Sequence, residues 1–271
     1  MPELPEVETT VRDLRPHVEG RTFAAVKVEI PRMVHAPAPA EFVRALPGRS
    51  ITMLQRHGKF IIFHLDHGAL VAHLMMGGGF LWKQPDDEPT IYTRLTFGLD
   101  DGAELRFVNP RTLGGVWLVD EPGVVVGHLG PDALDAAFTL EYFAGKLAGR
   151  SAPIKPLLLD QGLVAGVGNI YCDEALWLAG LRPEREAGSL TPQEVGRLHA
   201  MVLEALQKGV RLRGTSFDTY VNPGGDKGEH QDQTNVFRRE GKPCPRCGAV
   251  VQKIWFRGRG THFCPNPTCQ A

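Results

Sequence analysis

The sequence predicts an α+β protein with a strand-rich first half, a helical second half and a cysteine module at its C-terminus. Short β-type runs dominate the chain before residue 120, and helical patterns follow residue 130. Four of the five cysteines lie after residue 243. The strand runs follow one another directly rather than alternating with helices, which favours a sandwich or a barrel over a parallel sheet.

The first half begins with one helical pattern. Val7, Val11 and Leu14 recur at helical spacing within residues 3–17, with Pro16 near the end. Seven β-type runs follow, separated by clusters of Gly, Pro and Asp. They cover residues 23–30, 50–55, 60–65, 70–75, 92–97, 105–108 and 116–119. We therefore expect one β-rich domain over residues 1–130.

The second half is helical. Residues 135–147, 154–163 and 169–179 have helical patterns, and a glycine-rich turn covers residues 162–168. Thr191 and Glu194 form a capping box with Pro192 at the first helical position, which predicts a long helix ending near Lys208. Residues 214–231 are rich in Gly, Asn and Asp and predict a loop. We expect a helical domain over 131–235 and a separate module over 236–271.

Composition indicates a soluble globular protein rather than a membrane or secreted one. The chain is 42% hydrophobic and 23% charged. No apolar run approaches the roughly 18 residues of a membrane span, and the N-terminus has no secretory pattern, so we expect a cytoplasmic protein. The net charge of −1 does not indicate a nucleic-acid partner. However, seven Lys and Arg against the single acid Glu240 between residues 236 and 263 predict one basic face that meets phosphates.

The C-terminal cysteines predict a structural zinc site. Cys244 and Cys247 are separated by two residues, and Cys264 and Cys269 form a looser second pair. Four thiolates make a closed tetrahedral site that holds a fold and performs no chemistry. Two alternatives remain: His262 replaces one thiolate, or the four cysteines bind no metal. Cys172 lies among apolar residues of a predicted helix and is expected to be buried.

The N-terminus, Met1-Pro-Glu-Leu-Pro-Glu, allows two interpretations. In the simpler one, Glu3 and Glu6 stabilise the positive end of a helix dipole. In the other, removal of Met1 exposes the secondary amine of Pro2. Such an amine can attack a sugar C1′ and form an iminium, which is cationic without protonation and therefore assists eliminations. The adjacent Glu3 can transfer protons at the sugar oxygen.

Five segments together resemble the formamidopyrimidine-DNA glycosylase family, whose siblings are the endonuclease VIII enzymes. They are MPELPEVET at the N-terminus, HLMM at 73–76, NPRTLGG at 109–115, GVGNIY at 166–171 and the cysteine module. They occur in family order over the whole chain. The resemblance implies an N-terminal β-sandwich with an N-terminal helix, a helix–two-turn–helix domain and a β-hairpin zinc finger. It also implies one Zn²⁺, a double-stranded DNA partner, a bacterial cytoplasmic location and a monomer.

The resemblance implies five catalytic residues. Pro2 matches the nucleophile that forms a Schiff base, and Glu3 matches the proton donor for base loss. Glu6 matches a supporting carboxylate. Lys59 matches the lysine that donates a proton in strand cleavage and touches a phosphate. Arg259 matches the arginine that grips the phosphates of the flipped nucleotide. The alternative for Glu6 is a solvated surface glutamate. Taken alone, Lys59 would be interpreted as a lysine at a strand edge.

Further positions match contacts to the DNA backbone. Asn169 matches a residue that binds the phosphate beside the lesion, in keeping with the donors at a helix N-terminus. Arg150, Lys155 and His73 are expected to add backbone contacts, although each is equally consistent with a surface or packing role.

The resemblance also implies which residues fill the hole left by a flipped base, and they lie in two loops. Met76 and Arg111 match two of these void-filling residues, and Leu113 stands where the family usually has Phe. Tyr92 replaces a His that contacts DNA, and Asn109 stands where Asp is common.

The resemblance implies a bifunctional DNA glycosylase and AP lyase. It would remove 8-oxoguanine and formamidopyrimidines and then cleave the strand by β- and δ-elimination. Residues 228–230 depart from the usual lesion loop, so lesion preference is open. The alternatives are an endonuclease VIII-like enzyme for oxidised pyrimidines and a lesion-binding protein without chemistry. The Asn-Pro-Arg sequence and the 214–231 loop favour purines, while the presence of Pro2, Glu3 and Lys59 disfavours a pure binder.

Overall fold

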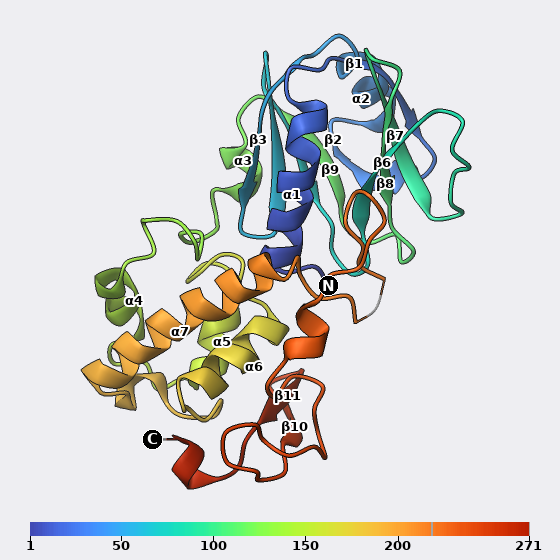
Figure 1. The fold of residues 1–271 in the computed structure, drawn as a ribbon. Helices are drawn as coiled ribbons and strands as arrows, with labels where there is room; N and C mark the ends of the chain where they lie inside the picture. Colours follow the sequence, from blue (N-terminus) through green and yellow to red (C-terminus); the bar gives the residue numbers. More distant parts are fainter. Residues whose placement is uncertain (218, 271) are drawn as a thin grey trace. The chain divides into compact units, whose positions relative to one another are not determined.

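The computed structural model describes residues 1–217 and 219–270, of which residues 268 and 270 are described by their backbone only. The chain forms two compact units (Figure 1). The first unit contains Met1–His128 together with Leu212–Glu229, and the second contains Leu129–Arg211 together with His230–Ala271. Among the described residues, no helix has the length and apolar character needed to cross a membrane.

Helix α1 (Leu4–Val18) opens the first unit, as the sequence predicts. Glu3 is its N-cap, and Glu3 and Glu6 form a reciprocal capping box that satisfies backbone N–H groups of the first turn. The apolar stripe of Val7, Val11 and Leu14 is buried in the core of the unit. The capping box and this stripe together set where the helix begins and which face it buries.

Two sheets form the rest of the first unit. The five-stranded sheet has the order β2-β9-β5-β4-β3, and the four-stranded sheet has the order β1-β7-β8-β6. The strands are β1 (Phe23–Val28), β2 (Val34–Ala36), β3 (Ile51–His57), β4 (Phe60–Leu65), β5 (Ala69–His73), β6 (Gly79–Lys83), β7 (Thr93–Leu99), β8 (Glu104–Val108) and β9 (Gly115–Val119). The short helices are α2 (Pro39–Ala45) and α3 (Gly123–Val126), with a 3₁₀ turn at Pro31–Met33.

Aromatic side chains join the two sheets into a sandwich. Phe63 of the five-stranded sheet lies with its ring centroid 6.4 Å from Phe23 and 5.7 Å from Phe80, both of the four-stranded sheet. Phe80 in turn contacts Phe107 at 5.1 Å. These contacts between inner faces confirm the predicted sandwich.

The sequence missed two strands and two short helices of this unit. Strand β6 begins at the last of three consecutive glycines, Gly77–Gly79, which are typical of a turn. Strand β2 has only three residues, α2 begins at Pro39, the second proline of an Ala-Pro-Ala-Pro run, and α3 has only four residues. Each of these elements is too short for a periodic pattern to reveal it.

Helices form most of the second unit. They are α4 (Leu140–Leu147), α5 (Ile154–Leu159), α6 (Asn169–Leu178) and α7 (Pro192–Arg211), with 3₁₀ turns at Ala187–Ser189, His230–Gln233 and Pro267–Gln270. Helix α7 packs on α6, where a Cβ on Gly209 would lie 2.4 Å from the Tyr171 ring. The capping box predicted at the start of α7 is present, since the backbone N–H of Thr191 donates to Glu194 Oε2 at 2.8 Å.

Two predicted helices are shorter than expected. Helix α4 begins at Leu140 rather than near residue 135, because the hydroxyl of Thr139 accepts a hydrogen bond from the Tyr142 N–H and caps it there. Helix α5 ends at Leu159, where the backbone of Asp160 is extended. The chain ends in a hairpin of β10 (Gln252–Phe256) and β11 (Arg259–Phe263).

The segment Leu212–Glu229 lies with the first unit, whereas the sequence assigned it to the helical domain. The hydrogen bonds of this segment to the rest of the first unit explain the difference. Thr215 and Tyr220 both hydrogen-bond to Glu6 of α1, and the carbonyl of Pro223 accepts from the N–H of Trp82 on β6.

Candidate functional site

Two buried carboxylates lie at the very start of the chain. Glu3 is the residue after Pro2 and is 3% exposed, and Glu6 is 1% exposed. Glu6 Oε2 accepts from the backbone N–H of Glu3 at 2.7 Å, and Glu6 Oε1 accepts from the backbone N–H of Thr215 at 2.7 Å. Burying carboxylates costs free energy unless hydrogen bonds compensate. Glu6 is thus a positioning group for the backbone at Glu3.

The 212–229 segment closes around Glu6. Gly214 has a φ of +81°, and a Cβ there would lie 2.8 Å from Glu6 Cγ, so a side chain would displace the carboxylate. The hydroxyl of Tyr220 donates to the backbone carbonyl of Glu6 at 3.1 Å. Burial, reinforced by the negative charge of Glu6, raises the pKa of Tyr220 well above its usual value. The hydroxyl therefore remains a donor at physiological pH.

Lys59 is the second residue of the two-residue turn between β3 and β4 and is largely buried. Its charge acts on His73, whose partner in the β4–β5 register is Phe60. Burial, then the charge of Lys59, then His35 lower the pKa of His73 to about 4. His73 is consequently neutral at pH 7, and its Nδ1 accepts from the N–H of Met75 at 3.3 Å. A phosphate contact by His73, as the sequence predicts, would use an uncharged imidazole.

The structure brings the expected void-filling residues together at one edge of the first unit. Met76 and Leu113 are 38% and 37% exposed, which is unusual for large apolar side chains. An Arg111 guanidinium nitrogen (Nη1) lies 3.5 Å from Met76 Sδ. Tyr92 is also exposed, and its ring lies 5.9 Å from the guanidinium carbon of Arg94. An exposed apolar pair beside a cation is typical of an interaction site.

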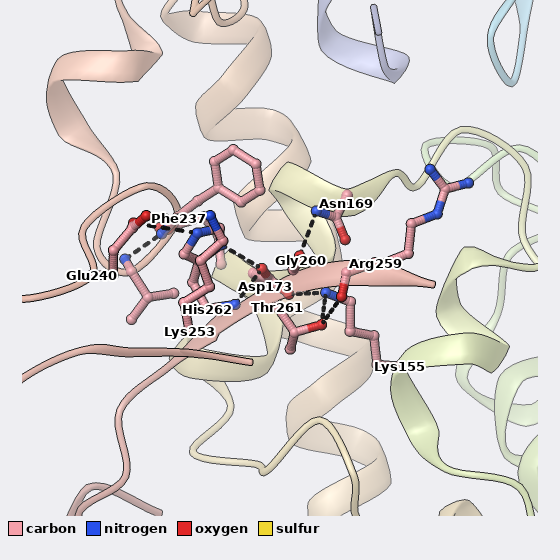
Figure 2. Close-up of polar contacts among 12 residues, drawn as sticks. Lys155, Asn169, Asp173, Phe237, Glu240, Lys253, Arg259, Gly260, Thr261 and His262 are labelled. Atoms are coloured by element: carbon pink, nitrogen blue, oxygen red, sulfur yellow. Dashed lines mark hydrogen bonds and ion pairs between the residues drawn. The ribbon is translucent and has the colours of Figure 1, made fainter. Parts of the chain in front are cut away.

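In the second unit, Asn169 is the first residue of α6, as expected of a phosphate-binding helix start. Its Nδ2 donates to the carbonyl of Gly260 on β11 at 2.9 Å (Figure 2). The contact ties the helix start to the hairpin that carries Arg259. Arg259 is exposed, and in Figure 2 its side chain extends away from the buried polar groups around Asp173.

Asp173, one helical turn after Asn169, is a buried carboxylate that the sequence analysis did not single out. It accepts from Lys155 Nζ at 2.6 Å and from the backbone N–H of His262 at 2.8 Å. Lys155 Nζ also donates to Thr261 Oγ1 at 2.8 Å (Figure 2). The four-residue spacing from Asn169, which puts both on one helix face, was the available signal.

The position of Lys155 favours a packing role, which the sequence left open beside a contact to the DNA backbone. Its side chain is 1% exposed, and its ammonium donates to Asp173 and Thr261. A buried, paired ammonium holds α5, α6 and β11 together. Arg150, between α4 and α5, is exposed and retains the expected capacity for a contact to the DNA backbone.

The four C-terminal cysteines form the site of one structural zinc ion. Their Sγ atoms lie within 4.8 Å of one another, with Cys244 to Cys269 at 3.7 Å and Cys247 to Cys264 at 3.4 Å. Tetrahedral Zn–S bonds of about 2.3 Å place sulfur atoms about 3.8 Å apart, so the site fits zinc. His262 is not part of this cluster, because its Nδ1 lies 3.2 Å from Asp173 Oδ2 and its Nε2 lies 3.4 Å from Glu240 Oε2. Cys172 is buried elsewhere, as expected.

Three family models match the chain in sequence order. Residues 1–116 match the formamidopyrimidine-DNA glycosylase N-terminal domain, and residues 129–221 match the H2TH domain of the same glycosylase. Residues 241–271 match a zinc finger found in FPG and IleRS.

Named relatives and solved structures agree with these matches. The formamidopyrimidine-DNA glycosylase of Symbiobacterium thermophilum is 44% identical over 100% of this chain and 89% of its own length. A Lactococcus lactis FPG variant in complex with Fapy-dG containing DNA aligns with a TM-score of 0.92 at 36% identity, covering 99% of each chain. The wild-type Lactococcus lactis Fpg in complex with oxidized pyrimidine containing DNA aligns with a TM-score of 0.90, also at 36% identity and 99% coverage of each chain.

Proposed function

The chain belongs to the formamidopyrimidine-DNA glycosylase family, and we propose that it is a bifunctional enzyme of base excision repair. It binds duplex DNA, flips out an oxidised purine, removes it as a DNA glycosylase and then cleaves the strand as an AP lyase. Zinc holds the finger and takes no part in the chemistry, because four thiolates leave no open coordination position.

The observation that carries this proposal is the pair of buried carboxylates beside Pro2. Glu3 and Glu6 are almost fully buried, and the hydrogen bonds of Glu6 fix the backbone at Glu3. The same capping box that starts α1 holds the backbone beside Pro2 in one conformation. It is well suited to hold an N-terminal amine and an acid in a defined geometry.

The proposed chemistry begins once Met1 is removed, since the Pro2 nitrogen is otherwise an amide without nucleophilic character. The amine attacks C1′ of the flipped nucleotide and the bond from C1′ to the base breaks. The base leaves with the bonding electrons and takes up the proton that the Pro2 nitrogen gives up. Glu3 donates a proton to the sugar ring oxygen as the ring opens. The product is an iminium between Pro2 and C1′. Loss of a C2′ proton then expels the 3′ phosphate, and a second elimination expels the 5′ phosphate.

Other residues support these steps from the positions already described. Lys59 supplies a proton in strand cleavage. Arg259 and Asn169 bind phosphates beside the lesion, with Arg150 and His73 as further backbone contacts. Met76, Arg111 and Leu113 fill the void left by the flipped base, with Tyr92 at their side. These side chains suit their roles. Met76 and Leu113 are apolar, and an apolar wedge unstacks bases. Arg111 is exposed, and an arginine can read a base edge.

Oxidised pyrimidines are a second candidate substrate class. The match to an Fpg structure with oxidized pyrimidine containing DNA favours some activity on them. Leu113 and residues 228–230 also depart from the pattern expected of a purine enzyme. We still favour purines, because the Asn-Pro-Arg sequence at 109–111 and the 214–231 loop match a purine enzyme.

Borohydride trapping on a duplex with a single 8-oxoguanine tests the proposal. The protein with Met1 removed should form a covalent adduct that maps to residue 2, and Pro2→Gly should sharply reduce it. The same assay on a thymine glycol duplex measures preference between lesions. Absence of an adduct on both duplexes and on abasic DNA, with zinc bound and Met1 confirmed absent, would reject the enzymatic proposal in favour of a lesion-binding protein.

A further inference from the structure

Asn109 is a completely buried side chain at the base of the loop that carries Arg111 and Leu113. It is 0% exposed and makes four side-chain hydrogen bonds. Its Oδ1 accepts from the backbone N–H of Arg111 at 3.0 Å and of Leu113 at 3.4 Å. Its Nδ2 donates to the carbonyls of Leu113 and of Leu74, the latter at 3.1 Å. The side chain thus uses both donors and both acceptor sites of its amide.

The orientation of this amide follows from its partners. Two N–H groups face one end of the side chain and two carbonyls face the other. Exchanging oxygen and nitrogen would set donors against donors and acceptors against acceptors, which excludes the flipped assignment. Asn109 therefore links two loops: residues 109–113 through both ends of its amide, and the Leu74 carbonyl at the end of the β5 strand through its NH₂ group.

Both loops are shaped around this link. Gly78 packs so closely that a Cβ would lie 2.1 Å from the Leu74 carbonyl oxygen and 2.7 Å from Asn109 Nδ2. Met75 and Thr112 adopt left-handed φ values of 46° and 49°, which are unfavourable for residues with side chains. Such backbone persists only where surrounding contacts impose it, and Asn109 supplies contacts to both loops.

Backbone contacts extend the link to a third segment. The N–H of Asn109 donates to the Tyr92 carbonyl at 2.9 Å, and Arg94 Nε donates to the Asn109 carbonyl at 2.8 Å. Exposed Tyr92 is therefore held against the same residue that holds the other two loops.

We propose that Asn109 is a positioning residue that holds Met76, Arg111 and Leu113 as one preformed void-filling unit. The inference rests on the proposed function. Three mobile side chains would lose conformational entropy when they enter the DNA. A unit that is already rigid avoids this cost. An Asp at this position would keep the two acceptor bonds but lose both donors, and its carboxylate would face two carbonyls. Compared with Asp, the Asn109 amide therefore adds the hydrogen bond to the Leu74 carbonyl, which connects residues 109–113 to the loop of Met76.

Two variants and two substrates test this inference. Asn109→Leu removes all four hydrogen bonds while keeping the number and branching of side-chain heavy atoms, and Asn109→Asp removes only the donor pair. The first substrate is an 8-oxoguanine duplex with 2-aminopurine beside the lesion, whose fluorescence reports unstacking. The second is a single-stranded abasic oligonucleotide, which leaves no void to fill. Ile51→Ala is the stability control, since Ile51 lies at the end of β3 remote from His57 and the β3–β4 turn.

Asn109→Leu should lower excision and the fluorescence rise on the duplex by about tenfold or more. Borohydride trapping on the abasic oligonucleotide should stay within about twofold of wild type, and Ile51→Ala should affect both substrates equally. Wild-type behaviour of Asn109→Leu on the duplex, or equal losses on both substrates, would overturn the inference. If Asn109→Leu does not fold, the same comparison with Asn109→Asp decides. Failure of the wild-type protein to trap either substrate would instead reject the proposed function.

Discussion

Glu6 Oε2 lies 2.7 Å from the backbone nitrogen of Glu3, so a buried carboxylate sets the geometry of the residue next to Pro2. Its other oxygen receives the N–H of Thr215 at the same distance. The Glu6 side chain therefore joins the start of the chain to the 212–229 segment. An ordered conformation of either part stabilises the conformation of the other.

Replacing Glu6 by Gln should weaken both stability and adduct formation. Gln can accept only one of the two N–H bonds, and its NH₂ group would face the other donor, at a cost of about 1–3 kcal/mol. We expect a drop in Tm of several degrees and about a tenfold slower borohydride adduct. Glu41→Gln, the same change at an exposed position in the first turn of α2, should leave both unchanged. Equal behaviour of the two variants would exclude a positioning role for Glu6.

Removing the carboxylate of Asp173 should strongly destabilise the second unit. Asp173→Ala leaves the buried ammonium of Lys155 without its ion-pair partner, and loss of one member of a buried pair costs about 3–5 kcal/mol. Urea unfolding measures the change. The partly exposed pair of Arg182 and Glu184 provides the comparison, since Glu184→Ala should cost at most about 1 kcal/mol. A small effect of Asp173→Ala would show that Lys155 finds another partner or reaches water.

Removing the metal should unfold the finger and weaken DNA binding. Cys264→Ser takes one thiolate from the site, and we expect loss of bound zinc and a lower Tm. DNA affinity should fall as well, because Asn169 and Arg259 depend on the hairpin for their positions. Cys172→Ser, at a buried cysteine outside the cluster, should keep one zinc per chain by elemental analysis. Full zinc content in Cys264→Ser would contradict the four-cysteine site.

His73 should contribute to acid sensitivity of the first unit. Its pKa is about 4 in the folded protein, against an ordinary value of 6.5, because of burial and the charges of Lys59 and His35. The unfolded chain therefore binds a proton at pH values where the folded one does not. The contribution of neutral His73 is fully present above pH 6.5 and is lost as the pH falls from 6.5 toward 4.

Replacing this imidazole should flatten that part of the stability profile. His73→Gln cannot titrate, so the free energy of unfolding should depend less on pH between about 4 and 6.5 than in the wild type. Denaturant unfolding at several pH values measures the slope. His67→Gln, at an exposed loop position, is the control and should retain the wild-type slope. An unchanged slope in His73→Gln would mean that His73 titrates normally in the folded protein.

Local sequence patterns predicted the elements with strong local causes. The capping box at Thr191 marked the start of α7, the spacing of Val7, Val11 and Leu14 marked α1, and the run at residues 60–65 matches β4. The cysteine spacing indicated a zinc site because thiolates have few other roles at that spacing. Each of these features depends on residues a few positions apart, which a linear sequence displays directly.

Contacts between distant residues were not accessible in this way. Burial of Lys155 depends on Asp173 and Thr261, and the central place of Asn109 depends on the Leu74 carbonyl 35 residues earlier. The sequence by itself determined the α+β class and the cysteine cluster, and it indicated Pro2 and Glu3 as the candidate reactive residues. Only the tertiary structure decided that Lys155 is a buried structural cation, that the 212–229 segment packs around Glu6 and that Asn109 joins two loops. The physical reason is that burial and long-range hydrogen bonds are properties of neighbours in space, whereas capping, periodicity and ligand spacing are properties of neighbours in sequence.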